Sequence, residues 1–218
     1  MRESIGPRYS GRLHFAFTNL LALSVIAFAL SRLRSPSALA WLTVPITFFY
    51  ANLVEYLAHR NPMHRPLRPF GLIYRRHSLE HHAFFTDQEL RAESTRDFKL
   101  VLFPWFMVLF FFGLFALPMG LVVRAVLGPN VGAIFLATAM AYFLTYEWLH
   151  LAYHLGPETA LGGVPFIQSL RRHHQTHHDP RQMSRANFNI TFPICDAIFG
   201  TSASGNRLGV AQPSTRDR

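Results

Sequence analysis

Four long apolar blocks constrain the fold of this 218-residue chain more than any other feature. They cover residues 13–30, 38–57, 100–123 and 131–153. Each has roughly the 17–25 residues that a helix needs to cross about 30 Å of hydrocarbon. None has the polar face that is typical of a helix on the surface of a soluble protein. One such block could be a buried core helix, but four in so short a chain predict an integral membrane protein.

The composition supports this prediction. Only 15% of the residues are charged, whereas soluble domains carry roughly 25%. The single cysteine, Cys195, excludes an intramolecular disulfide framework and a cysteine-based zinc site. The length suits one domain, which we expect over residues 13–201, with a flexible N-terminus over 1–12 and a flexible tail over 202–218.

Short connections predict that the four helices form two hairpins. The first two blocks are separated by residues 31–37, and the last two by a turn at Gly128-Pro129. The N-terminus, residues 58–99 and residues 154–218 then lie on one side of the membrane. That side carries 18 of the 21 Lys and Arg residues, so we expect it to be cytosolic. Since the basic residues flank the spans and no nucleic-acid-binding module is visible, we expect no nucleic-acid partner.

The histidines point to a metal site. Eleven of the twelve fall into four short boxes on the same side, at residues 59–64, 77–82, 150–154 and 173–178, while His14 stands alone and is expected to have no role in chemistry. Several are three or four residues apart and would share a helix face. Imidazole suits iron, zinc and copper. Ten or eleven imidazoles exceed what one ion can use, so two metal ions are predicted.

The order of these boxes resembles the fatty acid hydroxylase / sterol desaturase superfamily. The boxes read His-x4-His, His-x3-His-His, His-x3-His after a span, and His-x2-His-His. The closing run from Asn187 to Thr201 (NFNITFPICDAIFGT) is similar to the ending of the family. His77 lies one residue farther out than the usual pattern, with Ser78 in the usual place. Helical pairing with His81 would keep it within reach.

The resemblance implies a set of site residues. Candidates to orient the ligating rings by hydrogen bonds are Glu147, Asp179 and Asn187, with His173 at the rim of the site. Glu147 has two further possible roles, as a direct ligand or as a hydrogen-bonded cap. The implied metal ligands are His59, His64, His77, His81, His82, His150, His154, His174, His177 and His178.

The fold and function that follow are specific. The resemblance implies an all-α protein, with four transmembrane helices and a cytosolic helical cap that carries a di-metal site. It also implies an O2-dependent di-iron hydroxylase of a lipid acyl chain, with zinc possible in the purified protein. No haem- or flavin-binding module is visible, so electrons would come from a separate electron-transfer protein.

Alternatives remain at this stage. They are a sterol or carotenoid desaturase or hydroxylase of the same superfamily, and a non-catalytic membrane protein braced by zinc. A metal transporter is disfavoured, because the spans lack a series of polar ligands away from the cytosolic end.

Overall fold

The computed structural model describes residue 2 and residues 5–203, and within them every regular element is helical. Four helical stretches are long and apolar enough to cross a membrane, which confirms the predicted spans. They are Gly11–Ser31, Ala38–Met63, Phe98–Leu127 and Pro129–Tyr153.

The first and last spans are single α-helices, whereas the two others are composite. The first span is α1 (Gly11–Ser31) and the fourth is α8 (Pro129–Tyr153). The second is built from η2 (Ala38–Leu42), α2 (Thr43–Ala58) and the π-helical turn η3 (His59–Met63). The third is built from α5 (Phe98–Val101), α6 (Trp105–Phe111), the π-helical turn η5 (Phe112–Ala116) and α7 (Leu117–Leu127).

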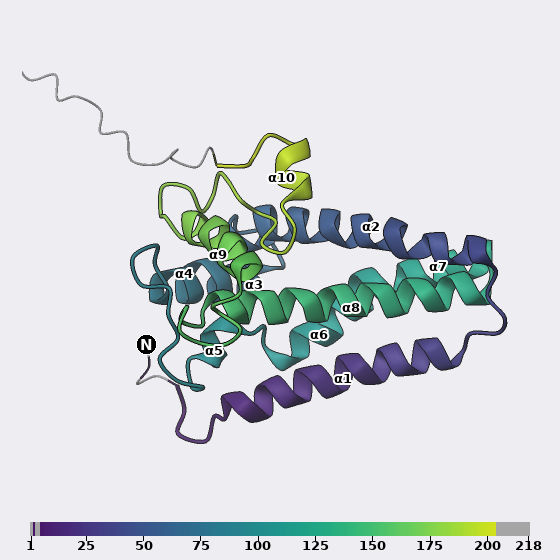
Figure 1. The fold of residues 1–218 in the computed structure, drawn as a ribbon, viewed down its shortest axis with the longest axis horizontal. Coiled ribbons are helices and arrows are strands. Elements are labelled where there is room, and N and C mark those ends of the chain that lie inside the picture. The colour runs from purple at the N-terminus through teal and green to yellow at the C-terminus, as the bar shows by residue number, and fades with distance from the viewer. Residues whose placement is uncertain (1, 3–4, 204–218) are drawn as a thin grey trace, which may run out of the picture.

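The spans pack side by side, and the remaining helices gather at one end of the bundle (Figure 1). Span α8 contacts α1, α2 and α7. The chain turns between the last two spans at Gly128, where φ is +96°, a conformation that costs glycine little. The cap at the other end consists of α3 (Gly71–Tyr74), the π-helical η4 (Arg75–His81), α4 (His82–Phe84), α9 (Pro165–His177) and α10 (Ile194–Ile198).

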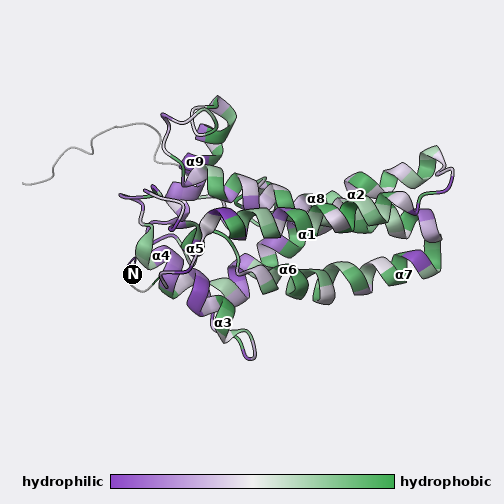
Figure 2. Ribbon diagram, turned by 90° about the horizontal axis from the view of Figure 1, so that it is seen from below, coloured by the Kyte–Doolittle hydropathy of each residue, from purple (hydrophilic) through white to green (hydrophobic). Residues whose placement is uncertain are grey.

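The cap lies at the same end as the N-terminus, which confirms the two-hairpin arrangement (Figure 1). Hydrophilic residues concentrate at this end, while the spans are mostly hydrophobic along their length (Figure 2). Within residues 1–12, which were predicted to be flexible, Ile5 is buried and Arg2 pairs with Asp97. Of the tail predicted for residues 202–218, residues 204–218 lie outside the described residues.

The third span is interrupted at Leu102–Pro104, next to the cap. Non-helical backbone at this depth needs hydrogen-bond partners from the protein. The amide N–H of Phe103 donates to Oε1 of Glu147 at 3.4 Å, and its carbonyl bonds to Nε2 of His14 at 3.0 Å. Thus α1 and α8 both hold the interruption in place, and the isolated His14 has a structural role that its sequence position did not reveal.

Candidate metal centre

Ten histidines from all four boxes converge at the boundary between the spans and the cap. All are buried, with no more than 7% of any one exposed. They are the ten that the sequence predicts as ligands: His59, His64, His77, His81, His82, His150, His154, His174, His177 and His178.

The rings form two neighbouring groups. The group that we call the first cluster contains His59, His64, His77, His82 and His177, whose ring nitrogens lie within 4.8 Å of one another.

The same limit joins His81, His150, His154 and His174, which form the second cluster, and it joins His178 with His81 and His82. Nε2 of His178 lies 3.2 Å from that of His81 and 3.0 Å from that of His174, so we count His178 with this cluster. The second cluster then contains His81, His150, His154, His174 and His178.

Local winding explains how residues five apart reach one cluster. His59 begins the π-helical turn η3 and His64 directly follows it. His77 lies within the π-helical η4 and His82 directly follows it. A π-helix bonds residue i to residue i+5, so side chains five apart come to the same side. His77 is therefore within reach, as expected. It joins the first cluster with His82, whereas His81, four residues on, points into the second.

Hydrogen bonds fix which nitrogen of each ring faces inward. Nδ1 of five rings contacts a backbone carbonyl, which can only accept, so Nδ1 carries the proton and Nε2 presents a lone pair. The Nδ1–O distances range from 2.5 to 2.9 Å. The pairs are His59 with Phe188, His81 with Leu100, His154 with Leu90, His177 with Ala186 and His178 with Phe85.

A sixth ring is oriented by a hydroxyl. Ser78 donates to the carbonyl of Met63 at 2.6 Å, which leaves its oxygen free to accept the Nδ1 proton of His64 at 3.1 Å. Ser78 therefore takes part in the site, although the histidine pattern gave it no role.

In the first cluster the inward-facing lone pairs of His64 and His177 meet, an approach that a bound cation would stabilise. Nε2 of His59 is 2.8 Å from that of His77, and Nε2 of His64 is 2.9 Å from that of His177. In the second cluster Nε2 of His174 is 3.2 Å from that of His154. Adjacent nitrogen ligands about 2.1 Å from one ion are roughly 3.0–3.4 Å apart. The donor set therefore fits a metal ion in each cluster.

Burial keeps these rings neutral, as metal ligands must be. Removal from water lowers the pKa of His81 to about 4, and the protonated neighbours it would face oppose charging further. The same two causes push the pKa of His77, His82, His174 and His178 well below the ordinary histidine value.

The residues predicted to orient the rings mostly do something else. Asp179 accepts from Arg181 and not from a histidine, because Arg181 is two residues away and forms a bidentate pair with it. The Asn187 side chain donates to the backbone carbonyl of His173 at 3.0 Å. His173 lies outside both clusters, with its ring bonded to the carbonyl of Asn189 at 3.1 Å.

Glu147 is buried beside the centre and supports the Phe103 backbone through one oxygen. Its other oxygen has no hydrogen-bond partner in the part of the chain that the structure describes. No imidazole lies within hydrogen-bonding distance of the Glu147 carboxylate in the described residues. Of its predicted roles, the hydrogen-bonded cap is the one that fits.

Two acidic residues that were not predicted hold residues 186–191, which we call the closing loop, against the metal centre. Glu55 accepts from the amides of Ile190 and Thr191, at 2.7 and 3.1 Å. Asp196 accepts from the amides of Phe188 and Asn189, at 2.9 and 2.7 Å. The signal for Glu55 was an acidic residue in an apolar span one helical turn before His59.

The comparisons with known proteins agree with this geometry. The family model described as fatty acid hydroxylase matches residues 44–201. A solved structure described as full-length scs7p, with only the hydroxylase domain visible, has a TM-score of 0.61 and 18% sequence identity to this chain. The match covers 89% of this chain and 67% of that one, and at this identity it shows a shared fold. A comparison with curated proteins finds no match.

The family match spans well over half of the chain and includes both clusters of histidines. The family is metal-dependent and its members are oxidoreductases of membrane lipids. On this evidence the chain is a multi-pass membrane protein that belongs to the fatty acid hydroxylase family.

Proposed function

We propose that this protein is a di-iron hydroxylase that uses O2 and an external electron donor to hydroxylate the acyl chain of a membrane lipid. The observation that carries the proposal is the pair of five-imidazole clusters, in each of which the ring nitrogens lie close together. The first cluster would hold one ion and the second cluster the other. Iron bound there would supply the redox chemistry needed to break an unactivated C–H bond, which no side chain can do.

A cavity next to the clusters supports the assignment. It has an empty volume of about 440 Å³ and is lined by His77 of the first cluster and by His81 and His150 of the second. We call it the histidine-lined cavity. Apart from Arg76, the other walls are apolar and come from α3, α5, the interruption of the third span and α6. A carbon atom held here would face both clusters at once.

The chain itself orients the ligands and excludes water. Backbone carbonyls hold five of the rings by Nδ1, so these rings keep their direction without moving during turnover. The burial of all ten rings keeps bulk water away from the reacting carbon.

The overall reaction balances only with a reductant. The lipid C–H bond, O2, two electrons and two protons give an alcohol and water. The electrons would come from a separate electron-transfer protein. We infer that it meets the cap, on the side that the distribution of Lys and Arg in the sequence predicts to be cytosolic.

The proposal is tested with the full-length protein in lipid nanodiscs, loaded with iron, reduced and exposed to O2. Mass spectrometry of the lipids should show a product that has gained one oxygen atom. His177→Ala should give no product and bind less metal, while still inserting into membranes. The proposal is wrong if the iron-loaded, reduced protein leaves every lipid class unchanged while the same preparation binds two zinc ions firmly.

A further inference from the structure

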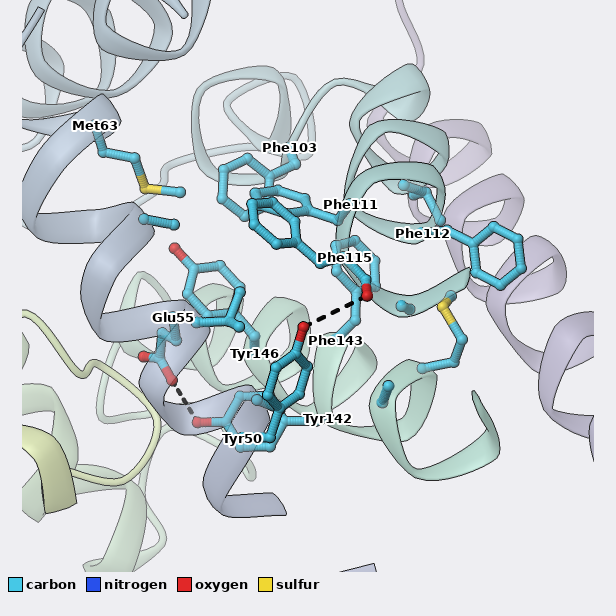
Figure 3. A pocket seen from close by; sticks show the side chains of 17 residues that line it. Tyr50, Glu55, Met63, Phe103, Phe111, Phe112, Phe115, Tyr142, Phe143 and Tyr146 are labelled. Atoms are coloured by element: carbon cyan, nitrogen blue, oxygen red, sulfur yellow. Dashed lines mark hydrogen bonds between the residues drawn. The ribbon is translucent and has the colours of Figure 1, made fainter. Parts of the chain in front are cut away.

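A second cavity lies inside the membrane-spanning bundle, between α2, α8 and the α6–η5 part of the third span (Figure 3). We call it the apolar chamber. The space between its walls, including its open side, is about 680 Å³, and the walls are mostly aromatic and aliphatic. The lining extends from Tyr50 to Ala58 on α2 and from Ala139 to Tyr146 on α8. At 1.5 Å per residue the chamber is about 12 Å long, parallel to the spans.

One polar atom of the chamber has no partner. Glu55 and the Tyr142 hydroxyl bond to each other, and the Tyr50 hydroxyl contacts the carbonyl of Phe115 at 3.5 Å (Figure 3). The Tyr146 hydroxyl is buried and has no hydrogen-bond partner among the described residues. Figure 3 shows it pointing towards Met63. The chamber therefore offers a hydrocarbon surface with one free hydroxyl near its cap end.

Phe103 separates this chamber from the metal centre. Among the described residues, it alone lines both the apolar chamber and the histidine-lined cavity. Its ring stacks on Tyr146, with centroids 5.2 Å apart and planes at 14°. Its backbone is fixed on both sides, by Glu147 and by His14. The ring is therefore a fixed wall at the junction of the two spaces.

We propose that the apolar chamber binds part of an acyl chain and that Phe103 determines how far this chain reaches towards the histidines. An acyl chain is the occupant because the chamber is apolar, is elongated along the membrane normal and is lined by three spans. Phe103 thus selects the carbon that is presented to the metal centre. The link to oxidation rests on the proposed hydroxylase function, but binding in the chamber does not.

The test separates binding from chemistry by using the zinc-loaded full-length protein in nanodiscs. The probe is a saturated fatty acid with a diazirine near its methyl end, photolysed and mapped by peptide mass spectrometry. Labels should appear in residues 108–116 and 139–146. Ala139→Leu adds three carbons to the chamber, and displacing two methylenes of the probe would weaken labelling about tenfold. The matched control Ala141→Leu changes an exposed position of the same helix and should label like the wild type.

Phe103→Ala should join the two spaces and add labels in residues 72–81, with an unchanged zinc content. Phe106→Ala, which alters only the histidine-lined cavity, should leave the labelling pattern unchanged. The proposal is overturned if labels fall outside the chamber, if Ala139→Leu labels normally, or if a sterol diazirine labels the chamber and the fatty acid does not. Normal labelling by a protein that hydroxylates no lipid would refute the proposed function and leave the chamber assignment standing.

Discussion

Glu55 gives the sharpest test of how the first cluster is built. Its carboxylate accepts four hydrogen bonds, from the amides of Ile190 and Thr191, the hydroxyl of Thr191 and the hydroxyl of Tyr142. Glu55→Ala would leave the two buried amides unpaired. Each unpaired group costs about 1–3 kcal/mol, so the closing loop would be destabilised by about 2–6 kcal/mol. Glu55→Gln retains one acceptor oxygen, so it should destabilise the closing loop less than Glu55→Ala does.

The loss should fall on one cluster. The loop that Glu55 holds supplies the carbonyls of Ala186 and Phe188, which orient His177 and His59 of the first cluster. No ring of the second cluster bonds to this loop within the described residues. Loss of a residue that orients ligands typically costs 10–100-fold in metal affinity, so we expect about that decrease for one ion and none for the other.

The measurement is a chelator titration with metal analysis of the retained protein. The variant should release one ion at roughly 10–100-fold lower chelator concentration than the wild type, following the same affinity loss, and hold the second ion normally. Thr47→Val is the matched control, because Thr47 is buried on the same helix and its hydroxyl has no partner. If Glu55→Ala kept both ions as the wild type does, or lost both together, the loop would not position the first cluster.

Three further predictions follow from the same structure. His173→Ala should retain both metals, unlike His177→Ala, because the His173 ring lies outside the clusters; elemental analysis of the two variants checks this. Gly11→Ala should lower the thermal stability by about 1–3 kcal/mol, since the added Cβ would lie 1.7 Å from the carbonyl oxygen of Thr95; equal melting temperatures would contradict this. The metal-free protein should lose stability as the pH falls from 6.5 towards 4, since the unfolded chain takes up protons at its ordinary histidine pKa of 6.5, while burial lowers the pKa of folded His81 to about 4. A stability that is flat over this range would refute the neutral, buried state of the rings.

The spans could be predicted because the membrane imposes a simple requirement on composition. Each predicted block lies within an observed span, and the observed spans extend it by zero to six residues at either end. The internal breaks could not be predicted in the same way. Pro104 lies in an apolar run that reads as continuous, and the backbone around Phe103 is tolerated only because Glu147 and His14, distant in sequence, bond to it.

The convergence of these ten histidines could be predicted from the boxes, but their division into two clusters could not. Helical spacing pairs His77 with His81, and the structure places them in different clusters. The reason is the π-helical winding of η4, which brings His82 and not His81 back to the side of His77. The spacing of five between His59 and His64, repeated between His77 and His82, was the available signal for this winding.

The ring-orienting groups were missed because backbone carbonyls leave no trace in a sequence. Carboxylates such as Asp179 were natural candidates, yet a buried carboxylate next to each ring would add negative charge to a site that already excludes water. A carbonyl orients an imidazole through the same Nδ1 proton without a net charge. The acidic residues Glu55 and Asp196 instead do not contact the ligating rings. Each accepts hydrogen bonds from backbone amides of the closing loop, whose carbonyls orient two of the rings. The rings are thus oriented by neutral groups, while Glu55 and Asp196 act on the site only through the loop that they hold.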